Sequence, residues 1–356
     1  MAEKTQTVFV TGASGFIAGH CILRLLKEGY AVRGSLRTSG QADEVRMALE
    51  PHVSTNDLSF ATLDLYSDDG WEEALKGCTY LLHVASPLPK ARPDHEDDLI
   101  IPARDGTLRA LRAAAKADVR RTVLTSSVAA IAHGENRDRD YIYSEEDWSN
   151  TEGDISAYGK SKTVAERAAW DFMETAEAGR MELAVINPSA VLGPLLGSDF
   201  SSSGQIVKRL LDGSVPACPA IGFSFIDVRD VADAHYEAML RPAAAGRRFA
   251  LVGDYAWMID VSRILNSAGY KSPTKKLPNF VVHILANFDK SVRMLKSGLG
   301  VRRHISNVRM RTELSIEPRS LDDMILSMAE SMVRFDVVQP DTSFFAWLWR
   351  RQRNEN

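Results

Sequence analysis

Cysteine is scarce in this chain of 356 residues. Its three cysteines, Cys21, Cys78 and Cys218, are odd in number and far apart, whereas disulfide frameworks and zinc sites use closely spaced pairs. The spacing argues against both kinds of site, and we expect no bound metal. Because reduced thiols are usual in the cytosol, the cysteine content favours a cytoplasmic protein.

Long apolar runs are lacking as well. No stretch approaches the roughly 18 consecutive apolar residues that predict a membrane span. The segment Met1 to Thr7 is polar and leads directly into a predicted strand, which does not fit the apolar part of a signal peptide. We therefore expect no membrane span.

A strong excess of positive charge is also missing. The formal net charge is -4, so no overall basic field would attract nucleic acid or an anionic membrane. The hydrophobic fraction of 45% and the charged fraction of 25% are those of ordinary globular proteins. This composition suits a protein that acts on a small molecule, as a monomer or a homodimer.

What the chain does have, in its first half, is an alternation of β-branched runs with helical patterns. The alternation predicts βαβ units, and hence an α/β fold with a doubly wound, parallel Rossmann sheet and helices on both faces. A first helix is expected from Phe16 to Glu28, ending at Gly29. The expected strands are Thr7 to Val10, Ala31 to Leu36, Leu58 to Thr62, Thr79 to Val84, Arg120 to Leu124 and Leu183 to Ile186.

The second half predicts a smaller, C-terminal substrate-binding lobe. We expect residues 1–190 to form the dinucleotide-binding domain and residues 223–254 to return to it, with Phe223 to Val228 as a strand of its sheet and Val231 to Leu240 as a helix. Residues 191–222 and 255–343 are assigned to the lobe. Its expected helices are Gln205 to Leu211, Asp260 to Asn266, Val281 to Phe288 and Leu321 to Val333.

The tail, residues 344–356, interleaves aromatic residues with arginines from Phe344 to Arg353. Such a segment can touch a membrane surface, but a short helix that docks on the body or on a second subunit is the favoured interpretation. It is assigned no catalytic role.

A glycine-rich turn follows the first predicted strand, in Thr11-Gly-Ala-Ser-Gly-Phe-Ile-Ala18. A turn between a strand and a helix lets backbone amides and the helix N-terminus hold a pyrophosphate. Serine replaces the second glycine of the usual fingerprint, and a tight turn without a ligand is the alternative interpretation. The residues expected to contact a dinucleotide here are Gly12, Ser14, Gly15, Phe16 and Ile17.

The second predicted strand bears on the choice of nicotinamide cofactor. From Ala31 to Thr38 there is no acidic residue to bind a ribose 2'-hydroxyl, and Arg33 and Arg37 would instead meet a 2'-phosphate. We therefore expect NADPH/NADP+, against the alternative that both arginines only solvate the sheet edge. Asp64, after the third strand, is expected either to accept a hydrogen bond from the adenine amino group or to lie in a surface loop.

Tyr158 and Lys162 stand four residues apart on a predicted helix, so they share one face. An ammonium beside a phenol favours the phenolate, and we expect Lys162, with an oxidised nicotinamide ring, to lower the tyrosine pKa. Ser126 and Ser127 end a predicted strand at the carboxyl edge of the sheet, where one hydroxyl could bind a substrate carbonyl and the other could form the turn. The three groups predict acid/base chemistry at a carbonyl.

With these motifs the chain resembles the extended short-chain dehydrogenases/reductases, and among them the dihydroflavonol-4-reductase-like carbonyl reductases that use NADPH. The resemblance also rests on Leu82 to Pro87, Val123 to Ser127, Asn187 to Ser189 and Phe225 to Ala232. It implies that Ser127 polarises the carbonyl, Tyr158 protonates its oxygen and Lys162 holds the nicotinamide ribose. The further cofactor contacts that it implies are Leu65, Val84, Ala85, Ser86, Pro188 and Ser189.

The substrate is expected to be an aldehyde, a ketone or a keto ester. Leu88, Val128 and Val191 are the expected substrate contacts, in mostly apolar surroundings. Cinnamoyl-CoA reductases carry Asn-Trp-Tyr-Cys-Tyr where this chain has Asp154 to Tyr158, which disfavours coenzyme A thioesters. The alternatives are a nucleotide-sugar epimerase or dehydratase, a hydroxysteroid dehydrogenase and a non-enzymatic NADP sensor; the retained tyrosine disfavours the sensor.

Overall fold

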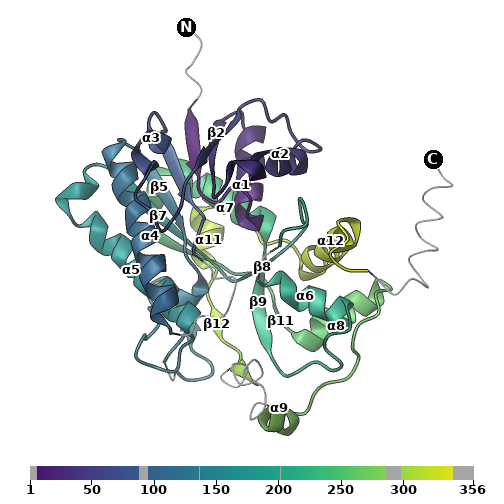
Figure 1. Ribbon diagram of the computed structural model, residues 1–356. Helices are drawn as coiled ribbons and strands as arrows, with labels where there is room; N and C mark the ends of the chain where they lie inside the picture. The colour runs from purple at the N-terminus through teal and green to yellow at the C-terminus, as the bar shows by residue number, and fades with distance from the viewer. Residues whose placement is uncertain (1–5, 88–94, 136, 201, 286–297, 340–356) are drawn as a thin grey trace, which may run out of the picture. The chain divides into compact units, whose positions relative to one another are not determined.

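The computed structural model describes residues 6–87, 95–135, 137–200, 202–285 and 298–339 (Figure 1). Within them the chain forms two compact units. The first unit contains the described residues up to Ser189, together with Arg229–Val252 and Arg303–Glu317. The second contains Ala190–Val228, the described part of Gly253–Arg302 and the described residues from Pro318 onward.

A seven-stranded parallel sheet forms the centre of the first unit, in the order β10-β7-β5-β4-β1-β2-β3. Strand order reverses between β1 and β4, and the carboxyl ends of strands at such a switch point are where α/β sheets bind ligands. The predicted α/β Rossmann class is confirmed. The strands are β1 Thr7–Val10, β2 Ala31–Leu36, β3 Leu58–Thr62, β4 Tyr80–His83, β5 Arg121–Thr125, β7 Glu182–Pro188 and β10 Arg247–Leu251.

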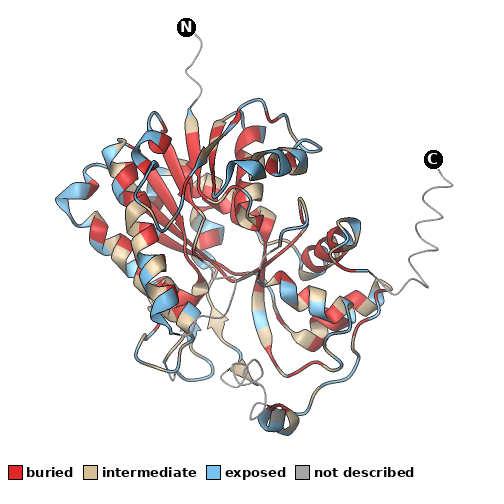
Figure 2. Cartoon of the chain, viewed as in Figure 1, coloured by how far each residue is buried: buried red, intermediate tan, exposed pale blue. Residues whose placement is uncertain are grey.

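Helices cover both faces of this sheet. The helices α3 Trp71–Leu75, α4 Asp97–Lys116 and α5 Ala157–Met173 share one apolar core with β1, β4, β5 and β7. On the other face, α1 Phe16–Lys27 lies against α7 Val228–Leu240, with Arg24 Nε 3.3 Å from Asp233 Oδ1. The central strands are buried almost throughout, as expected for parallel strands covered on both sides (Figure 2).

Smaller elements complete the first unit. They are α2 Ala42–Leu49, α11 Val308–Glu313, the paired short strands β6 Ile142–Tyr143 and β12 His304–Ile305, and the 3-10 helices Ser39–Gln41, Val128–Ala130, Ala176–Ala178 and Pro242–Ala244. The segment Arg303–Glu317 therefore belongs to the first unit, which the sequence did not indicate.

The second unit has its own three-stranded sheet, in the order β11-β9-β8. Its strands are β8 Ala190–Leu192, β9 Gly222–Asp227 and β11 Tyr255–Trp257, and its helices are α6 Gly204–Leu211, α8 Met258–Ser267, α9 Asn279–Leu285 and α12 Leu321–Arg334. Helix α12 is joined to the loop after β8, where the Leu195 amide donates to Ser331 Oγ at 2.9 Å. None of the helices in the described ranges is long and apolar enough to cross a bilayer.

One strand was predicted in the wrong sheet. Phe223 to Val228 was expected to return to the large sheet, but β9 pairs with β8 and β11 instead. The prediction was wrong because a short apolar run shows that a strand is buried but not which neighbours pair with it. Of the predicted helix Val281 to Phe288, the part beyond Leu285 lies outside the described residues, as does the aromatic tail.

Candidate functional site

The glycine-rich turn at the end of β1 offers a backbone site for an anion. Gly12 has φ +70°, and a Cβ at this position would lie 3.0 Å from Ala85 Cβ. Gly15 is the N-cap residue of α1, and no side chain caps the helix. The first amides of α1, including those of Phe16 and Ile17, therefore point outward without a capping side chain. The glycine-rich turn and the start of α1 therefore fit a dinucleotide pyrophosphate.

Arg33, within β2, and Arg37, just after it, have different surroundings. Arg33 Nη1 donates to the backbone oxygens of Ala74 at 2.7 Å and Lys76 at 3.2 Å, at the C-terminal end of α3, so this arginine is used inside the fold rather than for a 2'-phosphate. Arg37 follows the last residue of β2 and is exposed. Ser14 lies near the same segment, because its Oγ accepts a hydrogen bond from Gln41 Nε2 at 3.4 Å. Arg37 is thus the arginine that can meet a 2'-phosphate.

Asp64 and Leu65 follow β3. Asp64 Oδ1 accepts a hydrogen bond from the Tyr66 amide at 3.0 Å, which is the local turn that aspartate often forms. Leu65 Cβ lies 3.4 Å from where a Cβ on Gly106 would stand, so α4 comes close to this loop. The turn accounts for one carboxylate oxygen of Asp64, and a role toward adenine remains a prediction.

The end of β4 is tied to the end of β1. The Ala85 amide donates to Thr11 Oγ1 at 2.9 Å, and this hydroxyl lies 3.0 Å from His83 Nδ1. Burial, with a smaller effect of Lys162, lowers the pKa of His83 to about 3, so the ring is neutral. These bonds fix Val84 and Ala85 next to the glycine-rich turn.

Helix α5 brings Tyr158 and Lys162 to the carboxyl edge of the sheet. Ser156 caps the helix by accepting a hydrogen bond from the Gly159 amide at 3.1 Å. Lys162 Nζ lies 6.0 Å from the centroid of the Tyr158 ring. The two predicted partners therefore do share one face, as their spacing indicates.

The two serines after β5 are used differently. Ser126 Oγ donates to Glu166 Oε2 at 2.5 Å and is fully engaged in the interior. The Ser127 hydroxyl instead donates to Pro188 O at 3.5 Å and accepts a hydrogen bond from the Ala129 amide at 3.1 Å, and it lies close enough to the Tyr158 phenol to lower the pKa of that group. The geometry favours Ser127 as the serine that acts with Tyr158.

The acid/base groups have shifted pKa values. Desolvation raises the pKa of Tyr158, although part of its ring is exposed, and the hydrogen bond with Ser127 opposes this shift. Burial lowers the pKa of Lys162 to about 8, and Glu166 opposes that shift. The causes of the Tyr158 shift are desolvation and Ser127, so the expectation that Lys162 lowers the tyrosine pKa together with an oxidised nicotinamide ring remains a prediction for the cofactor-bound protein.

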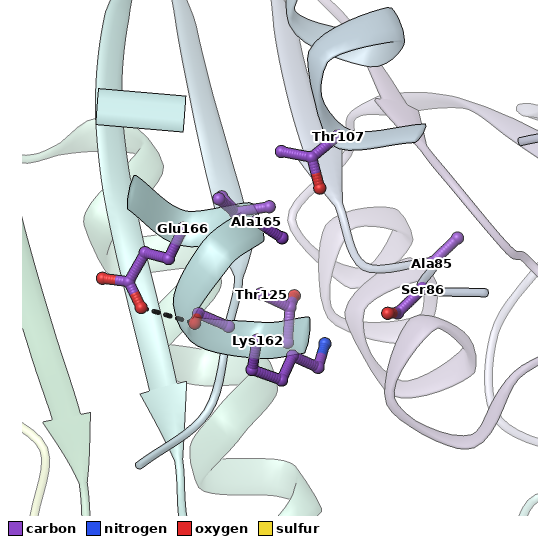
Figure 3. Close-up of a pocket in the computed structure, with 9 residues that line it drawn as sticks. Ala85, Ser86, Thr107, Thr125, Lys162, Ala165 and Glu166 are labelled. Carbon is purple, nitrogen blue, oxygen red and sulfur yellow. Dashed lines mark hydrogen bonds between the residues drawn. The ribbon is translucent and has the colours of Figure 1, made fainter. Parts of the chain in front are cut away.

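A small cavity of about 10 Å³ lies beside Lys162, about the space that one water needs (Figure 3). In Figure 3 the amino group of Lys162 points toward the loop that carries Ala85 and Ser86. The residues that line the cavity are Ala85, Ser86, Thr107, Leu124, Thr125, Ser126, Lys162, Ala165 and Glu166.

The end of β7 adds a polar group with no hydrogen-bond partner among the described residues. Ser189 Oγ is buried and unsatisfied, while the Ser189 amide donates to Leu251 O at 3.0 Å. Next to it, Pro188 O lies 3.5 Å from Ser127 Oγ. A buried hydroxyl of this kind fits a polar ligand, as expected for a residue beside a nicotinamide.

The predicted substrate contacts are not brought together in one unit. Val128 is half-buried in the 3-10 helix after Ser127, in the first unit. Val191 is buried in β8 of the second unit, and Leu88 lies outside the described residues. Substrate contact by all three remains a prediction.

Sequence reasoning missed four buried polar residues around this edge, which are His83, Glu166, Asn187 and Arg248. A signal for Glu166 was present, because it follows Lys162 by four residues on the same helix. The other three are far from Lys162 in the sequence. A search for clusters of metal-ligating side chains over the described residues finds none.

Comparison with known proteins yields one family and several reductases. The model of the NAD dependent epimerase/dehydratase family matches residues 8–253. NADPH-dependent methylglyoxal reductase GRE2 of Saccharomyces cerevisiae is 35% identical over 73% of this chain and 82% of its own length. Cinnamoyl-CoA reductase 1 of Petunia hybrida is 37% identical over 68% of this chain and 71% of its own length.

Among solved structures, yeast methylglyoxal/isovaleraldehyde reductase Gre2 complexed with NADPH superimposes with a TM-score of 0.77 at 28% identity. The match covers 93% of this chain and 99% of that one. Gre2 from Candida albicans, also in complex with NADPH, gives the same TM-score and coverage.

Proposed function

The chain belongs to the NAD dependent epimerase/dehydratase family, which contains the extended short-chain dehydrogenases/reductases, and from this premise we propose that it reduces a carbonyl group to an alcohol with NADPH. The observation that carries the proposal is the meeting of Ser127, Tyr158 and Lys162 at the switch-point edge of the sheet. The first unit holds the cofactor, and we assign substrate recognition to the second. The enzyme class is NADP-dependent oxidoreductase.

NADPH is the cofactor, as it is in the yeast and Candida Gre2 structures. When bound, it supplies a hydride to the carbonyl carbon. The missing side chain of Gly12 leaves room for the cofactor's pyrophosphate, which the uncapped start of α1 holds, and Arg37 pairs with the 2'-phosphate. Lys162 and the unsatisfied Ser189 hydroxyl bind the nicotinamide end of the cofactor.

Tyr158 provides the proton. Its raised pKa keeps the phenol protonated at neutral pH, which is the form that a reduction requires. Ser127 donates a hydrogen bond to the carbonyl oxygen, and the Tyr158 phenol transfers its proton to that oxygen as negative charge develops there. The ammonium of Lys162 then stabilises the phenolate that is left.

For the substrate we favour an aldehyde or ketone. The relatives include reductases named for methylglyoxal and for cinnamoyl-CoA. The segment from Asp154 to Tyr158 departs from the cinnamoyl-CoA reductase motif, which favours a free carbonyl over a coenzyme A thioester. Leu88, Val128 and Val191 are proposed to contact the substrate.

The experiment follows NADPH absorbance with a panel of aldehydes, diketones and β-keto esters, using the unmodified protein and Tyr158→Phe. We expect the variant to bind NADPH normally and to lose carbonyl reduction by about 100- to 10,000-fold, because it lacks the transferable proton. Full activity in the variant would remove Tyr158 from the mechanism.

A further inference from the structure

Helix α5 carries a third titratable residue on the face that bears Tyr158 and Lys162. Glu166 follows Lys162 by four residues, so the three side chains lie along one side of the helix. The Glu166 side chain is 0% exposed. An ionised carboxylate in the interior is costly unless it is paired and hydrogen-bonded. Its partners therefore indicate what this residue does.

Glu166 connects α5 to the ends of two strands. Its Oε2 accepts hydrogen bonds from Ser126 Oγ at 2.5 Å and from Asn187 Nδ2 at 2.7 Å (Figure 3 marks a hydrogen bond at Glu166 with a dashed line). Asn187 Nδ2 also donates to the backbone oxygen of Ser127 at 3.1 Å. One carboxylate thus joins the segment that carries Ser127 to the helix that carries Tyr158.

Arg248 of β10 balances the charge of Glu166. Its Nε donates to Glu166 Oε1 at 2.5 Å. Arg248 is itself fixed, because its Nη1 donates to the backbone oxygens of Glu145 and Asp147, both at 2.8 Å, and its guanidinium lies 3.8 Å from the centroid of the Trp148 ring. The carboxylate is therefore held by donors that cannot easily move.

The same carboxylate acts on Lys162. Burial lowers the pKa of Lys162 to about 8, and the negative charge of Glu166 opposes this shift. Two other titratable groups face Lys162: Tyr158 on its own helix and His83 on β4. His83 is neutral because burial, and next the charge of Lys162, lowers its pKa to about 3. Glu166 is thus the anion that helps Lys162 to keep its proton near neutral pH.

We propose that Glu166 is a positioning residue for the carbonyl reduction, which fixes the Ser127 segment against α5 and keeps Lys162 charged. The inference rests on the proposed function. Glu166 touches neither substrate nor cofactor in this role, and its effect passes through Ser127 and Lys162.

The central test is Glu166→Gln, which keeps the shape of the side chain and removes its charge. Reduction requires the protonated forms of Lys162 and Tyr158, so the rate falls as the pH rises through their pKa values. An ammonium that loses a neighbouring anion releases its proton more readily. We expect the descending limb of the kcat/KM profile to move by about 1 pH unit to lower pH, with kcat at pH 7 about 10-fold lower.

Two further variants separate this role from a loss of folding. Glu166→Asp keeps the charge and shifts the carboxylate, so kcat should fall while the limb stays in place. Glu182→Gln is the matched control, because Glu182 Oε2 pairs with the buried Arg121 Nη2 at 2.6 Å at the opposite end of β5 and β7. We expect it to lower Tm and to leave the limb where it is in the unmodified protein.

A folded fraction that is the same at every pH scales the whole profile and leaves the limb in place, so the fraction folded is measured at each pH alongside the activity. The role of Glu166 would be contradicted if the descending limbs of Glu166→Gln and Glu182→Gln lay at the same pH. It would also be contradicted if Glu166→Gln and Glu166→Asp shifted the limb by the same amount. NADPH fluorescence over the same pH range gives the same comparison without turnover. If the unmodified protein binds NADPH but reduces no carbonyl, the proposed function fails, and the binding profiles still decide the effect of Glu166 on Lys162.

Discussion

The two ends of the proposed dinucleotide site are built from different material. At β1 and β2 the site consists of backbone at Gly12, an uncapped helix start and the exposed side chain of Arg37. At β5 and β7 it consists of Ser127 and Lys162, and the buried Glu166 supports both through hydrogen bonds and charge. At the first end, shape and exposed charge determine how tightly the cofactor binds. At the second end, the protonation of buried groups determines the rate of the reaction. Substitutions at the first end should therefore change cofactor affinity, and those at the second should change kcat.

The largest difference within the chemical end is expected between its two serines. Ser127→Ala removes the hydroxyl that meets the Tyr158 phenol, and should lower kcat by about 100- to 1,000-fold with the KM for NADPH nearly unchanged. Ser126→Ala removes a hydroxyl that donates to Glu166, and should cost only a few-fold in kcat. Steady-state kinetics of both variants measures this. Equal losses of kcat in the two variants would contradict the separate roles of Ser126 and Ser127.

At the cofactor end, Gly12→Ala should weaken NADPH binding by about 30-fold, roughly 2 kcal/mol, because the added Cβ lies 3.0 Å from Ala85 Cβ at a positive φ. Gly40→Ala is the matched control, since a Cβ there meets nothing within 4 Å. NADPH fluorescence titration gives both affinities. Normal binding by Gly12→Ala would mean that the turn does not approach the cofactor.

A smaller effect is expected for the choice between the two cofactors. Arg37→Ala should raise the KM for NADPH by about 10-fold and leave that for NADH within about 2-fold, because it removes only the partner of the 2'-phosphate. Arg33→Ala should affect stability rather than cofactor preference, since Arg33 donates to the backbone of Ala74 and Lys76. Equal changes with NADPH and NADH in Arg37→Ala would contradict the assignment.

The contrast between the part of the site built from backbone and the part built from buried side chains also explains which features the sequence could predict. The predicted bounds of Thr7 to Val10 and Ala31 to Leu36 agree with the structure, because each run begins with β-branched or apolar residues and lies between turn signals. Spacing alone also placed Tyr158 and Lys162 on one helix face. Phe223 to Val228 was assigned to the wrong sheet, because local pattern does not determine which strands pair.

The buried network could not be predicted in the same way. Glu166 and Arg248 are 82 positions apart, and charged residues in a helix or a strand ordinarily face solvent. The sequence also could not show that Arg33 donates to the backbone at the end of α3 while Arg37 is exposed. The loss of hydration that raises the Tyr158 pKa could not be predicted either, because hydration depends on packing that spacing does not reveal.

The central claim is that Tyr158 gives its proton to a carbonyl oxygen while NADPH gives its hydride to the carbon. It is tested most directly by single turnover with NADPH deuterated at either C4 position and a small dicarbonyl such as methylglyoxal, followed by mass spectrometry of the alcohol. We predict that the unmodified protein places one deuterium on the carbinol carbon with one of the two labelled cofactors. Tyr158→Phe should bind NADPH equally well and form almost no labelled alcohol. Labelled alcohol formed by Tyr158→Phe at the rate of the unmodified protein would contradict the account.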